Sequence, residues 1–391
     1  MSQLLNERWS ETKEALLEGL QGNRRASMQV CLENTRRSLM ESATAGATSA
    51  GNIATLNRVI LPVIRRVMPT VIANEIVGVQ PMTGPVGQIH TLRVRYADSG
   101  DNVSAGEEAL SPFKIASAYS GNNSDANPKA NTTAAMEGQP GKRMSIQILK
   151  TPVEAKSRKL SARWTFEAAQ DAQAQQGIDI EAEIMAALAQ EITAEIDQEI
   201  LSSLRNLATV EETYDQSLVS GTATFVGDEH AALAIQINRV SNLIAQRTRR
   251  GAGNWAVVSN QALTILQSAT TSAFARTTEG TFEAPTNTKF VGTLNGAMRI
   301  YVDAYMSDTD DNNQVLIGYK GTSEADAAAF YCPYIPLMSS GVVLDPATFE
   351  PVVGFLTRYG YVELSNTASS LGNAADYLGK VAITSANVSF K

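Results

Sequence analysis

Few side chains in this sequence stand at a spacing that could support catalysis or metal binding. It has two histidines, His90 and His230. Asp228 and Glu229 precede His230, but no further ligand follows at metal-site spacing. The nucleophile-elbow, Walker A, zinc-protease and dinucleotide-binding motifs are absent from the sequence. We therefore interpret both histidines as structural and expect a protein that is not an enzyme and has no catalytic residues, cofactor or metal.

An acidic run resembles the start of a calcium-binding loop. It contains Asp308, Asp310 and Asp311, but Asn313 and Tyr319 stand where such a loop requires glycine and glutamate. We interpret the run as a solvated turn between two strands.

Three clustered arginines, Arg247, Arg249 and Arg250, are open to two interpretations. They could contact DNA phosphates, or they could be the cations that favour the C-terminal end of a helix. The net charge of −8 and the pI near 5.1 argue against a dedicated nucleic-acid binder. Weak contact with DNA remains compatible with this charge.

The cysteines and the apolar segments bear on where the chain resides. Cys31 and Cys332 lie far apart and follow no disulfide or zinc pattern, which suits a reducing cytoplasm. Glutamates interrupt the first twenty residues, so these do not form a secretory signal. Charged residues and prolines interrupt Val59–Val79, so we expect no membrane span.

The chain is long enough to form two compact lobes and extended segments. It has 391 residues, of which 43% are hydrophobic and 18% charged. Leu5, Trp9, Leu16 and Leu20 predict an amphipathic helix over the first twenty residues. Residues 42–52 are small and polar and predict a linker, after which the globular body begins.

Two segments alternate between apolar and polar residues, as strands do. They are Gln88–Tyr96 and Arg158–Phe166, and we interpret them as the two arms of a long hairpin. Between them lies Ala97–Arg143, which is too long and too polar for an ordinary turn. Such a loop is expected to become ordered by contact with a partner.

One long helix is predicted from Asp179 to about Leu207. Its apolar residues recur every four positions from Ile180 to Leu204, and Asp179 is a suitable N-cap. At about 1.5 Å per residue the helix is about 40 Å long.

The remaining chain predicts a mixed α+β lobe followed by a β-rich segment. The expected elements are a helix over 231–247, a strand over 255–259, a helix over 261–268, strands over 298–303 and 315–319, and β-structure over 327–334 and 351–364.

Three blocks of this sequence resemble the major capsid proteins of T-even-type myoviruses, which are tailed bacteriophages. The first is Ile76–Gly87 (IVGVQPMTGPVG) with the strand that follows it, and the second is Phe166–Ile200. The third is Ile317–Tyr361, which contains GYKG, CPY and GFLTRYG. The resemblance spans about residues 53–365.

The resemblance implies the α+β Hong Kong 97-type phage capsid fold, with a peripheral domain, an axial domain, an extended hairpin called the E-loop and an N-terminal arm. The loop Ala97–Arg143 looks too short and too polar for the folded insertion of T-even relatives. The expected boundaries are 1–52 for the N-terminal helix and arm, 53–87 for the start of the peripheral domain, 88–166 for the E-loop hairpin, 167–220 for the spine helix with more of the peripheral domain, 221–326 for the axial domain, 327–365 for the peripheral return and 366–391 for a C-terminal segment.

The resemblance also implies a function without catalysis. Members assemble into hexamers, and sometimes pentamers, that form an icosahedral head around double-stranded DNA. The implied partners are further copies of the chain, portal and scaffold proteins, decoration proteins and, by weak contact, the packaged DNA, with no membrane. The implied location is the virion, with assembly in the host cytoplasm. The alternatives are a cellular nanocompartment shell of the same fold and a soluble α+β enzyme.

Two sets of residues are expected to serve assembly. In the family the E-loop lies over the adjacent subunit, and the basic and acidic side chains that could pair across this contact are Arg93, Arg95, Lys159 and Arg163 with Glu181, Glu183, Glu191 and Glu195. The alternative is that these arginines are solvated. In the family a protease cuts after glutamate in a Leu-x-Glu pattern, which Leu39–Glu41 matches, so Glu41 is a candidate maturation site. The sequence starts at Met1, and we expect the segment up to Glu41 to stay attached.

Overall fold

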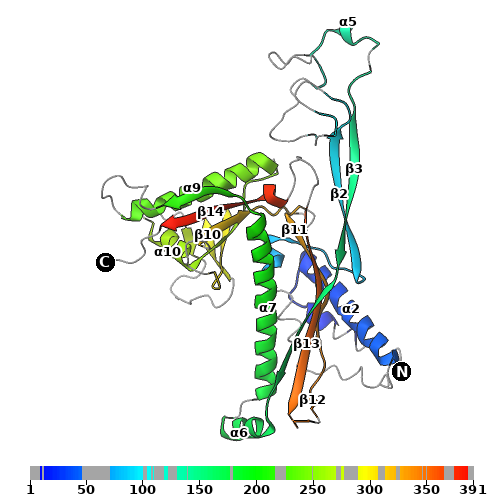
Figure 1. Cartoon of the computed structure of the whole chain (residues 1–391), viewed down its shortest axis with the longest axis vertical. Helices are drawn as coiled ribbons and strands as arrows, with labels where there is room; N and C mark the ends of the chain where they lie inside the picture. Colours follow the sequence, from blue (N-terminus) through cyan, green and yellow to red (C-terminus); the bar gives the residue numbers. More distant parts are fainter. Residues whose placement is uncertain are drawn as a thin grey trace. The chain divides into compact units, whose positions relative to one another are not determined.

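The computed structural model is an α+β protein, as predicted, and it divides into two compact units (Figure 1). Unit 1 comprises parts of Met1–Gly87, Pro152–Ser202 and Phe330–Val362, and unit 2 parts of Gln88–Thr151, Ser203–Ala329 and Glu363–Lys391. The residues described are 9–10, 13–45, 71–99, 104–106, 109, 119–121, 130–138, 140–176, 179–215, 226–248, 250–269, 274–276, 289–306, 313–322, 326–345, 347–348, 350–364 and 374–385.

The N-terminal region of unit 1 differs from its prediction. Residues 13–17 are helical, but the chain turns at Gly19, where φ is 81°, so the predicted helix stops there. A second helix, α2 (Gly22–Ala45), follows and takes in the first four residues of the predicted linker. Alanine, serine and threonine are compatible with a helix when its other turns are packed, which explains the error.

α2 lies against the rest of unit 1 through one buried face. Met28, Cys31, Leu32 and Thr35 follow helical spacing and are all buried. The Asn34 amide donates to Met82 O at 2.7 Å and to Tyr334 O at 3.0 Å, so polar contacts also attach the helix.

The long strand β13 (Pro351–Glu363) is central to the sheet of unit 1. The strand order is β1 (Gly78–Val79), β11 (Ala329–Ser339), β13 and β12 (Val343–Leu344). Strand β4 (Lys156–Arg163) joins the other edge of β13 in antiparallel register, from Lys156 opposite Tyr359 to Arg163 opposite Val352. Unit 1 also contains α4 (Ala73–Ile76) and α6 (Phe166–Gln176).

The predicted pairing of the hairpin arms is wrong. Strand β2 (Val86–Tyr96) pairs with β3 (Met144–Glu154), whereas the second predicted arm is β4, which belongs to the sheet of unit 1 and ends at Arg163. Alternation shows that a segment is a strand but does not identify its partner, and neighbouring strands in sequence tend to pair. A short helix, α5 (Thr133–Met136), lies between the true arms, and most of Ala97–Arg143 is outside the described residues.

The long helix is confirmed as α7 (Ile180–Leu207). Asp179 Oδ1 accepts a hydrogen bond from Glu181 N at 3.1 Å, which confirms the predicted N-cap. Its buried hydrophobic side chains are Met185, Leu188, Ala189, Ile192, Ala194, Ile196, Ile200, Leu201 and Leu204. Buried Asp197 accepts from Ile72 N at 2.9 Å and so holds the start of α4.

Unit 2 contains a seven-stranded sheet covered by two helices, α9 (Val226–Thr248) and α10 (Asn260–Ser268). The strand order is β5 (Val210–Asp215), β14 (Leu378–Ser385), β10 (Gln314–Gly318), β6 (Trp255–Val258), β9 (Met298–Val302), β8 (Lys289–Leu294) and β7 (Phe274–Arg276). Leu233, Ile237, Val240 and Ile244 of α9 pack into its core. A short 3₁₀ helix, η2 (Ala374–Tyr377), precedes β14. The predicted helices and strands in this part of the chain are confirmed to within a few residues.

The first glycine of GYKG allows β10 to approach β6 closely. A Cβ at Gly318 would lie 2.1 Å from Trp255 Cζ2, inside van der Waals contact. We expect Gly318→Ala to destabilise unit 2 by about 1–3 kcal/mol, measured by chemical denaturation. Gly354→Ala is the matched control, because its Cβ would come no closer than 3.5 Å to a neighbour, and an equal loss in both variants would contradict this explanation.

Candidate functional site

The described part of the chain offers no group of side chains suited to metal binding. Among those residues, no group of three histidine, cysteine, aspartate or glutamate side chains is placed to hold a metal ion. No helix there is long and apolar enough to cross a membrane. Cys31 and Cys332 are buried free thiols, and burial raises their pKa values to about 12 and about 11. The acidic run 308–311 is outside the described residues.

The two histidines lie in contrasting surroundings. His90 is exposed on β2, whereas His230 is buried in α9, with Nδ1 2.5 Å from Ser268 Oγ. Burial lowers the pKa of His230, and the neighbouring Glu229 opposes this shift only in part. The neutral imidazole is therefore a packing element of unit 2.

The stability of unit 2 is expected to fall as the pH drops below about 6.5, the usual pKa of an unfolded-state histidine. Between that value and the lower folded-state pKa, the unfolded chain binds a proton that the folded chain excludes. His230→Gln should flatten this dependence in thermal unfolding between pH 5 and 7, whereas His90→Gln should leave it intact. If both variants keep the wild-type slope, His230 is not its source.

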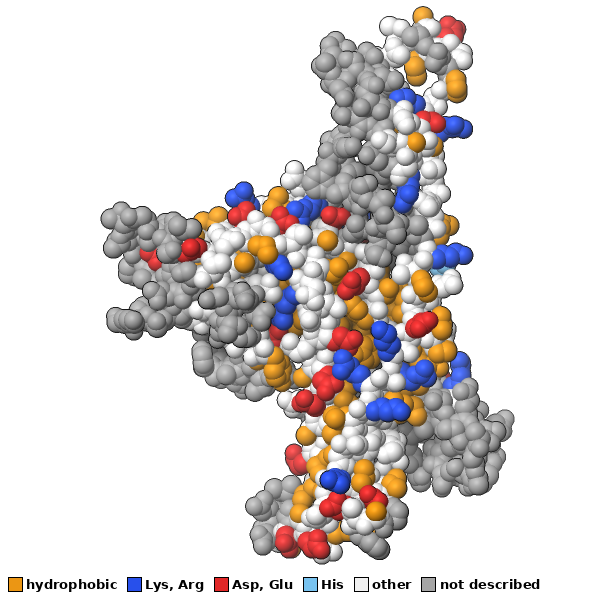
Figure 2. Space-filling model, viewed as in Figure 1, with side chains coloured by type: hydrophobic (Ala, Val, Ile, Leu, Met, Phe, Trp, Pro, Cys, Tyr) orange, Lys and Arg blue, Asp and Glu red, His pale blue; other side chains and the backbone are white. Residues whose placement is uncertain are grey.

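The arginines considered for DNA contact are engaged in ion pairs. Arg247 lies 2.6 Å from Glu211, and Arg250 lies 2.6 Å from Asp326. Arg249 is outside the described residues. On the face that Figure 2 shows, acidic and basic side chains are interspersed with apolar ones over the described part of the chain. This arrangement favours a structural role for Arg247 and Arg250.

One basic residue that the sequence analysis did not select organises the acidic side of α7. Arg158 of β4 lies 2.8 Å from Glu195 and also pairs with Glu199, which accepts from the Tyr359 hydroxyl. Burial opposes ionisation of Glu199, but its hydrogen bonds from Arg158 and Tyr359 outweigh that effect and lower its pKa. Glu195 therefore already has a partner within its own chain. Alternation along β4 could have shown that Arg158 faces opposite to Lys159.

The other predicted contact residues are distributed over several elements. Arg163 is exposed, with Nε 3.7 Å from Glu350, and Lys159 lies on the same face of β4. Glu183 and Glu191 are exposed on α7, and Glu181 is half-buried. Arg95 is half-buried on β2, and the side chain of Arg93 is outside the described residues. The pairing of these bases with glutamates of another copy stays a prediction.

The hairpin exposes an apolar stripe that the sequence analysis missed. Met144, Ile146 and Ile148 alternate along β3 and are 51%, 68% and 60% exposed, respectively. Side chains two apart on a strand share a face, so the three form a continuous row. Large apolar side chains gathered in this way commonly mark a surface that binds another protein. The alternation of 144–148 was readable from the sequence, but its exposure was not.

Farther along, the hairpin has a small core of its own. Buried Tyr96 and Ala109 pack with Tyr119, and the Tyr119 hydroxyl donates to Arg143 O at 2.5 Å. Ala97 N donates to Arg143 O at 2.9 Å, which keeps the arms paired there. The apolar stripe is thus presented on an ordered ribbon.

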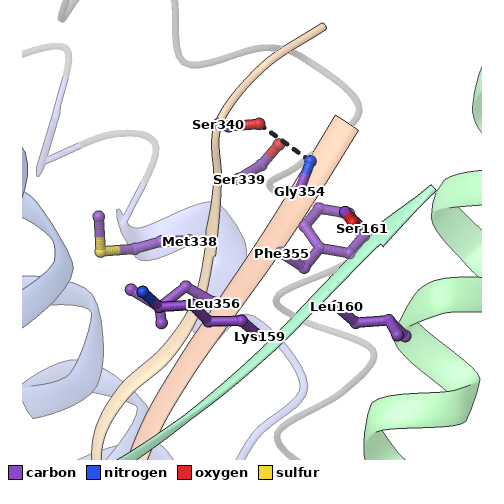
Figure 3. A pocket seen from close by; sticks show the side chains of 9 residues that line it. All are labelled: Lys159, Leu160, Ser161, Met338, Ser339, Ser340, Gly354, Phe355 and Leu356. Carbon is purple, nitrogen blue, oxygen red and sulfur yellow. Dashed lines mark hydrogen bonds between the residues drawn. The ribbon is translucent and has the colours of Figure 1, made fainter. Parts of the chain in front are cut away.

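A second apolar surface is a hollow of about 430 Å³ in the sheet of unit 1 (Figure 3). Strands β4, β11 and β13, with the residue that follows β11, line it with Lys159, Leu160, Ser161, Met338, Ser339, Ser340, Gly354, Phe355 and Leu356. Gly354 N donates to Ser340 Oγ at 2.9 Å, which fixes the wall at that point. The hollow and the stripe are surfaces suited to protein contacts.

Comparisons with known proteins identify the family to which the sequence is similar. Residues 53–383 match the family described as Major capsid protein Gp23. The chain is 30% identical over 410 residues to the Major capsid protein of Enterobacteria phage T4, covering 81% of this chain and 76% of that protein. It is 28% identical over 426 residues to that of Vibrio phage KVP40, covering 85% of this chain and 81% of that protein.

Several similar solved structures come from bacteriophages. One is the asymmetric unit of the bacteriophage PhiM1 mature capsid, with a TM-score of 0.45 and 12% identity over 79% of this chain and 85% of that chain. Another, from Mycobacterium phage Bobi, has a TM-score of 0.46 and 13% identity over 80% of this chain and 90% of that chain.

Proposed function

This chain belongs to the Major capsid protein Gp23 family. From that membership we propose that it assembles into hexamers, and into pentamers as some members of the family do, that form an icosahedral phage head around double-stranded DNA. The observation that carries the proposal within the chain is the exposed stripe Met144, Ile146 and Ile148. Exposure of such an apolar row to water is unfavourable in free energy, and the binding of a second copy would bury it. Many modest contacts around a closed shell then add up to a stable particle.

The elements fit the Hong Kong 97-type fold that the resemblance implied. In this proposal the hairpin of β2 and β3 is the E-loop and α7 is the spine helix. The sheet around β13 then belongs to the peripheral domain and the seven-stranded sheet to the axial domain. Portal, scaffold and decoration proteins are the expected partners, with weak contacts to DNA. No catalytic role is proposed.

The assembly state of the full-length chain tests this function. We expect closed shells by electron microscopy when the chain is expressed with its scaffold and portal proteins, with free monomer as the minor form. A DNA-filled head from infected cells supports the phage capsid function, whereas a shell filled with protein would favour a nanocompartment. A chain that stays monomeric at high concentration with those partners present would overturn the proposal.

Charge reversal on the hairpin is expected to weaken assembly. Arg93→Glu with Arg95→Glu should place like charges opposite the glutamates of an adjacent α7, such as Glu183 and Glu191. Each exposed pair contributes about 0–1 kcal/mol, but the contact repeats at every subunit. The yield of particles should fall and wild-type association should weaken at high salt. Normal heads with unchanged salt tolerance would show that these arginines are solvated.

The candidate maturation site after Glu41 lies within α2. A protease must therefore open the last turns of this helix before it can bind the chain in an extended form. Retention of the N-terminal segment remains our proposal, and the intact mass of the subunit in purified virions tests it. A mass that begins at Ser42 would show cleavage.

A further inference from the structure

The hollow in unit 1 lies on one definite face of the sheet. Gly354 stands opposite Ser161 and Leu356 opposite Lys159, and residues paired across two strands share a face. The alternate residues Phe355 and Leu160 also border the hollow, but their side chains point to the other face of the sheet, where Phe355 is buried. The hollow therefore forms where Gly354 contributes no side chain, with Leu356 and Met338 beside it (Figure 3).

The rim of this hollow is basic. Lys159 lines it, and Arg163, whose Nε is 3.7 Å from Glu350, lies on the same face of β4 with its side chain 69% exposed. Arg358, two residues beyond Leu356 on the same face, lies over the ring of Tyr334 at 5.3 Å. An apolar floor with a cationic rim suits an aromatic or aliphatic side chain that has carboxylates next to it.

The N-terminal turn of α6 carries such a combination. Phe166 is 48% exposed, and the exposed carboxylates Glu167 and Asp171 follow it on the same helix. Phe166 of the same chain is not among the residues that line the hollow, and it lies beyond the end of β4. Among the described residues, only those of the three strands and Ser340 line the hollow, so it is open to a side chain of another copy.

We infer that α6 of a second copy of this chain docks at the hollow, with Phe166 inserted beside Leu356 and Met338 and with Glu167 and Asp171 near the basic rim. This inference rests on the proposed function, since it requires subunits that assemble. The contact between α6 and the hollow is separate from the contact made by the hairpin. The acidic side chains of α6 and the basic rim of the hollow are complementary in charge, and this fixes the orientation of α6.

Cross-linking between two variants of the full-length chain tests the contact directly. One population carries Glu167→Cys and the other Lys159→Cys, and Phe166 is kept in both. The buried native thiols have pKa values raised to about 12 and about 11, so they remain protonated and unreactive at pH 8. Mixed assembly followed by oxidation should give disulfide-linked dimers that contain one chain of each kind. The same dimers formed instead by Val343→Cys with Lys159→Cys would assign the hollow to the exposed turn at Val343 and overturn this inference.

Blocking variants test whether the contact contributes to assembly. Gly354→Leu fills the hollow from inside, and its Cβ meets no atom closer than Ser340 Oγ at 3.5 Å. Both Gly354→Leu and Phe166→Ala should lower particle yield by about tenfold or more, as the loss of a central contact residue does. Phe290→Ala is the matched control, because Phe290 is also exposed, at 40%, but packs on Tyr301 of its own unit.

The outcomes separate this inference from the proposed function. If the wild type forms shells while Gly354→Leu and Phe166→Ala assemble as well as Phe290→Ala and no mixed dimer appears, the docking of α6 is wrong and the capsid function stands. If the wild type forms no particle with its partners present, both fail. Should Gly354→Leu not fold, the cross-linking result decides alone.

Discussion

Replacing Asp303 with alanine is expected to lower the free energy of unfolding of unit 2 by about 3–5 kcal/mol. Its carboxylate is fully buried and forms an ion pair with Arg205, in the last turn of α7. It also accepts from Tyr305 N at 3.0 Å. Removal of the carboxylate leaves the guanidinium of Arg205, itself only 14% exposed, without its counter-charge, and an uncompensated charge in that position is strongly destabilising.

The measurement is the emission of Trp255, which is buried in unit 2, in chains in which Trp9 and Trp164 are replaced by phenylalanine. Glu212→Ala is the control, because its partner Arg239 is 70% exposed and the pair should contribute about 0–1 kcal/mol. Arg205→Met with Asp303→Leu should recover much of the stability, since no charge is left buried. If Asp303→Ala lowers the free energy of unfolding no more than the control does, then water solvates the guanidinium of Arg205 in that variant.

The elements that the sequence predicted well are those whose periodicity reflects burial in their own chain. The long helix α7 and the helix α9 each show a regular apolar stripe, and their positions are confirmed. The hairpin failed at its second arm because β3 and β4 both alternate, and only the three-dimensional register with β13 distinguishes them. α2 was missed because its buried face mixes Cys31, Asn34 and Thr35 with apolar residues.

The sequence predicted which strand face carries basic residues in the candidate site, but not which other residues lie beside that face. Charge alternation identified Lys159 and Arg163 as one face of a strand, and the structure adds that Leu356 and Met338 lie beside that face around an open hollow. The pairing of Arg158 with Glu195 depends on two segments 37 residues apart, which spacing alone could not relate. Exposure is a property of the folded chain, so neither the stripe on β3 nor Phe166 could be recognised as a contact residue from the sequence.

Ile146→Asp combined with Ile148→Asp is expected to abolish shell formation while the subunit stays folded. Both side chains are more than half exposed, so the free energy of unfolding should change by no more than about 0.5 kcal/mol per site. In the assembled particle, each carboxylate would be buried against a second copy without a partner, which costs several kcal/mol. With about 1.4 kcal/mol for each factor of ten, two such sites should reduce association by about a hundredfold or more.

The opposite face of the same strand provides the control for this experiment. Ser145 and Gln147 are exposed and alternate with the stripe, so Ser145→Asp with Gln147→Asp adds the same charge to the same hairpin without touching the apolar row. Sedimentation and electron microscopy of both double variants, expressed with scaffold and portal proteins, distinguish the two effects. Because both carry two added carboxylates, equal loss of particles would trace the defect to charge on the hairpin, whereas loss confined to the Ile146 and Ile148 variant identifies the apolar stripe as the surface that a neighbouring subunit covers.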